Sequence, residues 1–209
     1  MKPLIKICGV NDIQILHELI MIDEVNFIGF IFYNDSPRNV TDNFLQKISK
    51  IDFKNKRPVC VYVNSSKEHI QETSSYFKDP ILQFHGDEPA GFCESFDRKY
   101  IKAFHAYNLR YWKNYMDLYS SAHAFLIDSG NSVQKGGTGI AFDWKLIPKT
   151  EKEKIIVAGG INSSNVSDLL SKKNNIFGID VNSGLESKET IKDIEKIETF
   201  FKVLKKNGK

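Results

Sequence analysis

The sequence predicts an α/β protein built as a single-domain (β/α)8 barrel, the TIM-barrel class, over residues 1–209. Short runs rich in β-branched and apolar residues recur eight times, and most are followed by a segment of helical character. This alternation is typical of a parallel sheet. Eight such units in 209 residues fit the short end of barrel lengths. The first run ends in "CGVND" and lacks the GxGxxG turn of many open doubly wound sheets.

The predicted elements alternate in order along the chain. Strands are expected at residues 4–8, 26–32, 58–63, 81–85, 100–104, 124–128, 154–159 and 176–181. Helices are expected at residues 12–22, 44–51, 68–77, 109–119, 164–173 and 189–206, the last being the most clearly amphipathic. Fainter helical patterns follow the fourth and sixth strands. Because no linker or low-complexity tract interrupts the series, we expect one catalytic domain.

Composition narrows the classes of function. Hydrophobic residues make up 41% and the net charge is +3, an ordinary globular balance that does not argue for nucleic acid. No apolar run reaches the ~18 residues of a membrane span, and no secretion signal is recognisable. Cys8, Cys60 and Cys93 are widely spaced, so neither a disulfide framework nor a zinc site is indicated. We expect a cytoplasmic protein without nucleic-acid or membrane partners, and Cys60 and Cys93 as buried apolar residues.

Reactive side chains gather where the predicted strands end. In barrels the active site lies at the C-terminal ends of the strands. Those ends carry Cys8, Asn64, His85, His105, Asp128 and Asp180. Strand alternation puts Lys6 on the same face as Cys8, one layer beneath it. A cation there would favour the thiolate of Cys8, although Lys6 could equally belong to an internal ion pair.

Glycine-rich segments follow the last three predicted strands. They are "KGGTG" at 135–139, "AGGI" at 158–161 and "NSGLES" at 182–187, the last able to start a small extra helix. Glycines let a backbone approach an anion closely, and barrels often bind phosphate at their last loops. The sequence therefore predicts a phosphate site, with tight turns alone as the alternative. Its predicted residues are Gly136, Gly137, Thr138, Gly139, Gly159, Gly160, Asn182, Ser183 and Gly184.

Short motifs along nearly the whole chain resemble the phosphoribosylanthranilate isomerase family of tryptophan biosynthesis. They are "KICG", "GFIF" with "SPR", "VYVN", "QFHGDE", "IKAF", "LIDS" with "GGTG" and "FDW", "AGGIN" with "NV", and "GIDVNSGLE". The chain departs from the family pattern in three places. Asn11 stands where the family usually has Thr, Asn182 stands where it usually has Ser, and "KETIKD" lacks the Pro-Gly that often precedes "KD".

The resemblance implies a reaction and its residues. The reaction is the Amadori rearrangement of N-(5-phosphoribosyl)anthranilate to 1-(2-carboxyphenylamino)-1-deoxyribulose 5-phosphate, without metal or cofactor. It implies Cys8 as general base and Asp128 as general acid. Arg38 is expected near the anthranilate carboxylate, and Lys6, His85 and Asp180 around the substrate. Similar proteins are monomers or homodimers, and we expect one of these two states.

Other functions fit part of the pattern. A metal-dependent sugar-phosphate epimerase would use His85, Asp128 and Asp180 as a one-His, two-carboxylate site, but it leaves Cys8 unexplained. A non-catalytic binder of phosphate ligands would have no need of Cys8 and Asp128. A dual-substrate isomerase that also serves histidine biosynthesis would resemble a different barrel family that uses two aspartates.

Overall fold

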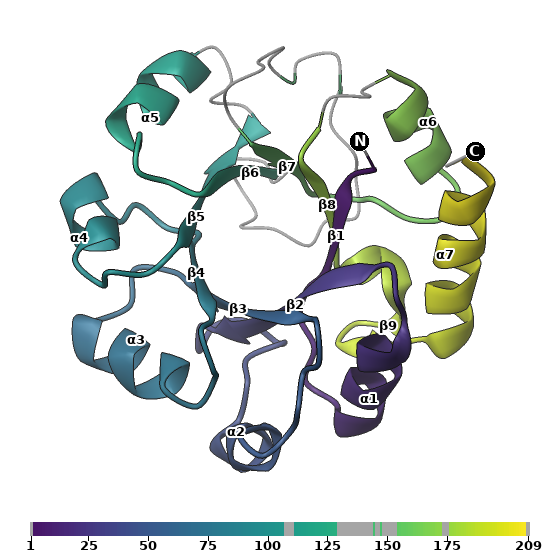
Figure 1. Ribbon diagram of the computed structural model, residues 1–209, viewed down its shortest axis with the longest axis horizontal. Helices are drawn as coiled ribbons and strands as arrows, with labels where there is room; N and C mark the ends of the chain where they lie inside the picture. Colours follow the sequence, from purple (N-terminus) through teal and green to yellow (C-terminus); the bar gives the residue numbers. More distant parts are fainter. Residues whose placement is uncertain are drawn as a thin grey trace.

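Eight parallel strands close into a barrel in the computed structural model (Figure 1). The structure describes residues 2–106, 111–128, 144, 147, 154–172 and 176–207. Each strand pairs with the next in the chain, and the last pairs with the first, so the predicted fold class is confirmed. The strands are β1 Leu4–Ile7, β2 Val25–Phe32, β3 Arg57–Tyr62, β4 Ile81–Phe84, β5 Tyr100–His105, β6 Ala124–Asp128, β7 Ile155–Val157 and β8 Gly178–Val181.

Helices form an outer ring around the barrel (Figure 1). They are α1 Ile13–Met21, α2 Asp42–Ile48, α3 Lys67–Ser74, α4 Ala90–Glu94, α5 Trp112–Leu118, α6 Val166–Lys172 and α7 Ile194–Asn207. Polar side chains begin several of them: Asp12 accepts from two backbone N–H groups of α1, and Thr41 and Ser66 each accept from one. The fainter pattern after the fourth strand is the short α4, and the one after the sixth strand falls mostly outside the described residues.

Two apolar clusters hold the layers together. The larger one lies between the strands and the surrounding helices, and it includes the buried Cys60 and Cys93, as expected. The smaller one fills the barrel interior with inward-facing side chains such as Val61, Ile101 and Leu126. Cys8 belongs to this inner cluster. The barrel is therefore a packed core whose upper layer carries the thiol.

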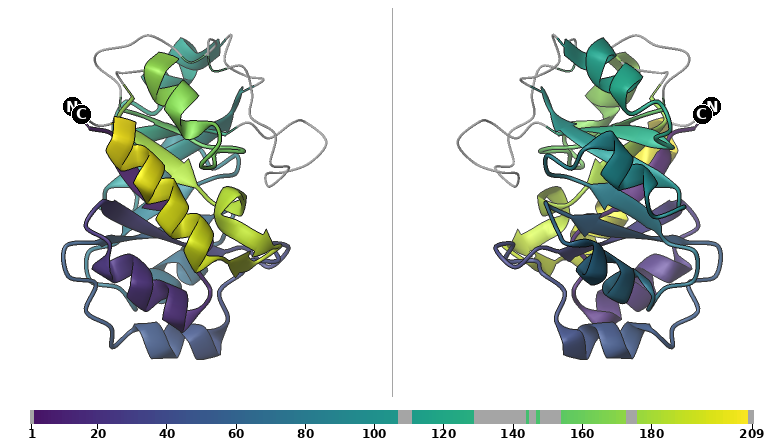
Figure 2. Two further views of the ribbon diagram at one scale, coloured as in Figure 1. Left: turned by 90° about the vertical axis from the view of Figure 1, so that its right-hand side faces the viewer. Right: turned by 90° about the vertical axis from the view of Figure 1, so that its left-hand side faces the viewer.

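The C-terminal helix begins five residues later than the sequence pattern predicts. Residues 186–192 form the strands β9 Glu186–Lys188 and β10 Ile191–Lys192, an antiparallel hairpin. Thr190 at its turn has a φ of 72°, a conformation that no helix contains. Asp193 starts α7 instead, because its side chain accepts from Lys196 N–H and its carbonyl from Ile197 N–H. The hairpin lies at the edge of the barrel where the strands end (Figure 2).

Among the described residues, none of the helices combines the length and the apolar character that crossing a membrane requires.

Candidate active site

A cavity of about 670 Å³ opens at the C-terminal ends of the strands, a size that suits a small-molecule ligand. Most of the predicted site residues line it together, although they come from distant parts of the chain. They are Cys8, Arg38, His85, Asp128, Gly159, Gly160, Asp180, Asn182, Ser183 and Gly184. The predicted phosphate residues Gly136, Gly137, Thr138 and Gly139 lie outside the described residues.

Cys8 lies directly after β1 and is buried, with its backbone N–H donating to the Val181 carbonyl at 2.9 Å. Lys6 is fully buried and does not line the cavity, so it lies beneath the site and supports it from below. A Cβ added at Gly29 would lie 2.9 Å from the Cys8 Sγ and 3.0 Å from the Lys6 Nζ. The thiol and the ammonium therefore share the space that this glycine leaves open.

Asp180 of β8 is the ionic partner of Lys6. Strand register places the two residues side by side, and the Lys6 Nζ donates to both carboxylate oxygens at 3.0 Å. Burial opposes the charged form of Lys6, but Asp180 and Cys8 outweigh it and raise the pKa of Lys6. Burial raises the pKa of Asp180, and the positive charge of Lys6 lowers it by a smaller amount, so the pKa is raised overall. With an ammonium on both oxygens, Asp180 is a carboxylate at neutral pH.

The Cys8 thiol is less acidic than the sequence analysis expects. Burial raises its pKa above the ordinary value of 9.0, and the Asp180 carboxylate adds to this effect. Lys6 and Lys192 lower the pKa of Cys8, as a neighbouring cation should, but they do not offset the burial. Without ligand, the site therefore holds Cys8 mainly as a thiol near neutral pH.

His85 and Asp128 are neighbours at the mouth of the barrel. The His85 Nε2 lies 3.4 Å from the Asp128 Oδ2. The Gln83 amide lies 3.0 Å from the His85 Nδ1, on the same strand face as the sequence predicts. With the Gln83 amide as the donor, the His85 proton is on Nε2 and points at the Asp128 carboxyl group.

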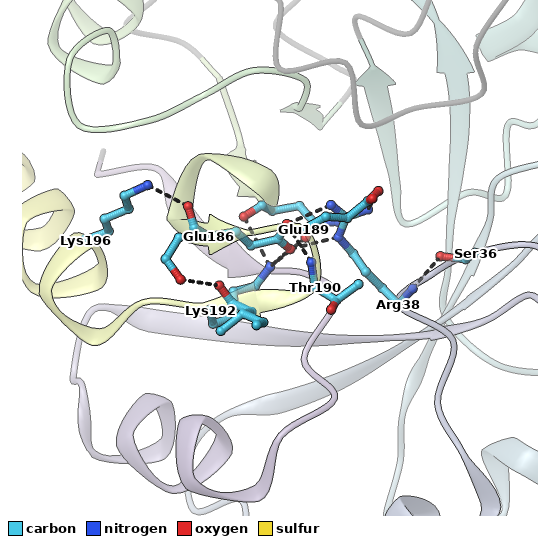
Figure 3. Close-up of polar contacts among 10 residues, drawn as sticks. Ser36, Arg38, Glu186, Glu189, Thr190, Lys192 and Lys196 are labelled. Carbon is cyan, nitrogen blue, oxygen red and sulfur yellow. Dashed lines mark hydrogen bonds and ion pairs between the residues drawn. The ribbon is translucent and has the colours of Figure 1, made fainter.

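Arg38 follows β2 and is held by an acidic partner from the hairpin (Figure 3). Its Nε and Nη2 donate to the two Glu186 oxygens at 2.8 and 2.7 Å, a bidentate pair. The Lys192 Nζ donates to the same carboxylate at 2.7 Å. Although burial opposes ionisation, the bonds from Arg38 and Lys192 lower the pKa of Glu186 to about 2. One edge of the guanidinium is thus occupied, and Nη1 takes no part in this bidentate pair.

The turn after β7 carries two glycines in the left-handed region. Gly159 and Gly160 have φ values of 86° and 63°, which L-residues with side chains rarely adopt. The Asn165 amide fixes this turn by donating to the Gly160 carbonyl at 2.8 Å. After β8, Ser183–Leu185 form a short 3-10 turn, where the sequence predicts a small extra helix. Both turns line the cavity.

A sequence model of the N-(5'-phosphoribosyl)anthranilate isomerase family matches residues 5–203 of this chain. The chain belongs to this family. The enzyme is therefore an isomerase of tryptophan biosynthesis, as its motifs suggest.

Named relatives cover nearly the whole chain. The N-(5'-phosphoribosyl)anthranilate isomerase of Nitrosomonas europaea is 36% identical, over 96% of this chain and 94% of its own length. The crystal structure of the isomerase from Thermotoga maritima has a TM-score of 0.84 and 28% identity, covering 98% of this chain and 99% of that one. Another family structure, a complex with reduced 1-(o-carboxyphenylamino)-1-deoxyribulose 5-phosphate, has a TM-score of 0.79 and 26% identity over the same shares.

Sequence reasoning missed a further buried ion pair, Lys102 with Glu88, at the mouth of this isomerase. The Glu88 carboxylate accepts from the backbone N–H groups of Asn64 and Gly86 and from the Lys102 Nζ at 2.7 Å. Lys102 also donates to the Gly86 carbonyl at 2.7 Å. The pair therefore fixes the loops after β3 and β4, including the one that carries His85. The only sequence signal was the position of these residues within the "QFHGDE" and "IKAF" motifs.

The described residues do not offer the metal site that an epimerase-like enzyme would need. No cluster of three His, Cys, Asp or Glu side chains in the described ranges is arranged to hold a metal ion. Both oxygens of Asp180 accept from Lys6, so this carboxylate is not available as a ligand beside His85 and Asp128.

Proposed function

We propose that this isomerase converts N-(5-phosphoribosyl)anthranilate to 1-(2-carboxyphenylamino)-1-deoxyribulose 5-phosphate, with Cys8 as general base and Asp128 as general acid. The observation that carries the proposal is that a thiol directly after β1 and a carboxyl group at the end of β6 line one cavity. These strands are not neighbours in the barrel, so the two groups approach a ligand from different sides.

Asp128 starts the reaction by protonating the furanose ring oxygen. The bond between C1′ and that oxygen breaks, and the nitrogen lone pair forms a C1′=N double bond, which gives a protonated Schiff base. Asp128 is left as a carboxylate. His85, 3.4 Å away, is placed to stabilise that charge through its Nε2 proton.

Cys8 then removes the proton from C2′. The C–H electrons form a C1′=C2′ bond, and the electrons of the C1′=N bond return to nitrogen, which gives an enolamine. The enolamine becomes the ketone when its 2′-hydroxyl loses a proton and C1′ gains one. The positive Schiff base beside Cys8 favours loss of the thiol proton to solvent at the open end of the cavity, because a nearby opposite charge lowers the pKa of a thiol. The cation formed in the first step thus prepares the base for the second.

Binding groups surround this pair. The open edge of Arg38 suits the anthranilate carboxylate, because a guanidinium and a carboxylate match in shape and charge. The turns at Gly159–Gly160 and at Ser183–Gly184 suit the phosphate, since backbone N–H groups can donate to its oxygens. This distribution would place the sugar between the two ends, near Cys8 and Asp128.

Turnover of phosphoribosylanthranilate, followed through its fluorescence, tests the proposal. The wild type should consume the substrate, and Cys8→Ala and Asp128→Asn should each lower kcat by about 10²–10⁴ or more while the fold survives. Cys60→Ala, a buried cysteine outside the cavity, is the matched control and should keep its turnover. A wild type that binds the substrate without converting it would favour the phosphate-ligand binder instead.

A further inference from the structure

The hairpin turn carries a carboxylate whose position suggests a role in ligand binding. The Glu189 Oε1 lies 3.9 Å from the Arg38 Nη1, on the guanidinium edge that Glu186 leaves open (Figure 3). The Glu189 side chain is 70% exposed, whereas those of Arg38 and Glu186 are buried. Glu189 also lines the cavity that holds Cys8. Glu189 therefore lies on the guanidinium edge that a ligand carboxylate could use without displacing Glu186.

Charge counting supports a place for one anion at this point. Ion pairs join four residues into one cluster: Arg38, Glu186, Glu189 and Lys192. Its buried part holds two cations, Arg38 and Lys192, and one carboxylate, Glu186. One positive charge is thus left over, and Glu189 balances it. If a ligand carboxylate joined the cluster while Glu189 stayed, the cluster would carry an excess negative charge beside the buried Asp180. An incoming carboxylate is therefore accommodated at lowest cost when Glu189 leaves.

The turn is built so that Glu189 is presented to Arg38. Thr190, the next residue, has a φ of 72°, which is unfavourable for a β-branched residue. Its backbone N–H donates to the Glu186 Oε2 at 3.2 Å, so the carboxylate that holds Arg38 also holds the turn. The ion pair itself is long and exposed, and such pairs are weak. The Glu189 side chain can consequently swing into solvent without disturbing the buried pair.

We propose that Glu189 is an internal competitor for the carboxylate of the substrate. It neutralises the open edge of Arg38 in the empty enzyme and is displaced when the anthranilate carboxylate binds there. The inference rests on the proposed function, which assigns that carboxylate to Arg38. In this role Glu189 lowers affinity for carboxylate ligands, keeps weakly held anions off Arg38 and assists product release.

Calorimetric binding of two ligands to the intact enzyme tests the inference. The first is reduced 1-(o-carboxyphenylamino)-1-deoxyribulose 5-phosphate, and the second is its phenylamino analogue without the carboxylate. Glu189→Gln should lower the Kd of the first by about twofold to fivefold, the range expected for one exposed ion pair, and leave the Kd of the second unchanged. In turnover, KM should fall by a similar factor while kcat changes less. Glu68→Gln on α3, an exposed glutamate outside the cavity, is the charge-matched control and should shift neither Kd.

Two results would overturn the inference while leaving the proposed function intact. One is an unchanged or higher Kd of the carboxylate ligand in Glu189→Gln. The other is an equal gain for both ligands, since this would reflect overall charge and not the carboxylate. If neither ligand binds the wild type, the proposed function fails and the inference falls with it.

Discussion

Lys6 and Asp180 lie side by side on the first and last strands of the barrel, and the Lys6 ammonium donates to both Asp180 oxygens at 3.0 Å. The pair is buried directly beneath the thiol of Cys8. The two charges have opposite effects on the pKa of that thiol, because Lys6 lowers it and Asp180 raises it.

Single substitutions in this pair should shift the acidity of Cys8 in opposite directions. Lys6→Met removes a cation that lowers the pKa of Cys8, so the pKa should rise further above 9.0. Asp180→Asn removes an anion that raises the pKa of Cys8, so the pKa should fall. The pH dependence of iodoacetamide labelling of the Cys8 peptide measures both. Shifts in the same direction, in variants that melt cooperatively, would contradict this account.

Gly29→Ala should disturb the thiol directly. The new Cβ would lie 2.9 Å from the Cys8 Sγ and 3.1 Å from its Cα, so part of the backbone would have to move. Overpacking of this kind costs about 1–3 kcal/mol of stability, and we expect kcat to fall because the base is displaced. Gly91→Ala in α4 is the matched control, since its Cβ would meet no atom within 4 Å. If both variants keep wild-type kcat, the space beside Cys8 does not matter for catalysis.

Glu186 should make stability depend on acid pH. Its pKa is about 2 in the folded state and 4.5 ordinarily, so its contribution is present above about pH 4.5 and is lost as pH falls toward 2. The corresponding stabilisation is about 3 kcal/mol, taken from the two pKa values. In urea denaturation, Glu186→Gln should be less stable than wild type at pH 7, and the difference should shrink toward pH 3.

The exposed Glu198, which pairs with Lys202, provides the comparison for that experiment. Glu198→Gln should change stability by less than about 0.5 kcal/mol at either pH, because exposed helix pairs contribute little. A constant difference between wild type and Glu186→Gln across the acid range would show that Glu186 is not the group that titrates.

The strained turn should tolerate glycine. A β-branched residue in the left-handed conformation destabilises the fold by about 1–2 kcal/mol, and Thr190→Gly removes this strain. The added backbone freedom of glycine costs about 0.5–1 kcal/mol in return. Thermal unfolding should therefore show equal or slightly higher stability. Lys188→Gly, an exposed change in the same hairpin without a positive φ, should instead lose stability. Destabilisation of both variants to the same extent would mean that Thr190 is not strained.

The sequence anticipated the strands better than the ion pairs. Strands buried on both faces appear as continuous apolar runs, and β4, β5 and β6 begin at the predicted residues. The start of α7 was misplaced because Ile191 and Ile194 continue the helical apolar spacing, although both are exposed in the folded chain. Local periodicity cannot reveal that Thr190 turns the backbone out of a helix.

The same contrast between local and long-range features holds for the site residues. The positions of Cys8, His85 and Asp128 at strand ends within motifs predict that they lie together, and all three line one cavity. The partnership of Arg38 with Glu186 joins residues 148 positions apart, and only the folded hairpin brings them together. The raised pKa of Cys8 also depends on burial, which sequence alone does not measure.

Closure of the barrel by β1 and β8 also bears on how the enzyme is made. Cys8 is synthesised well before its neighbour Asp180, which follows more than a hundred positions later. Until β8 leaves the ribosome and pairs with β1, the thiol lacks the layer that buries it. The Cys8 thiol therefore stays unburied in the nascent chain until β8 has been made. Chaperones that shield the early strands would protect this thiol as well as prevent aggregation.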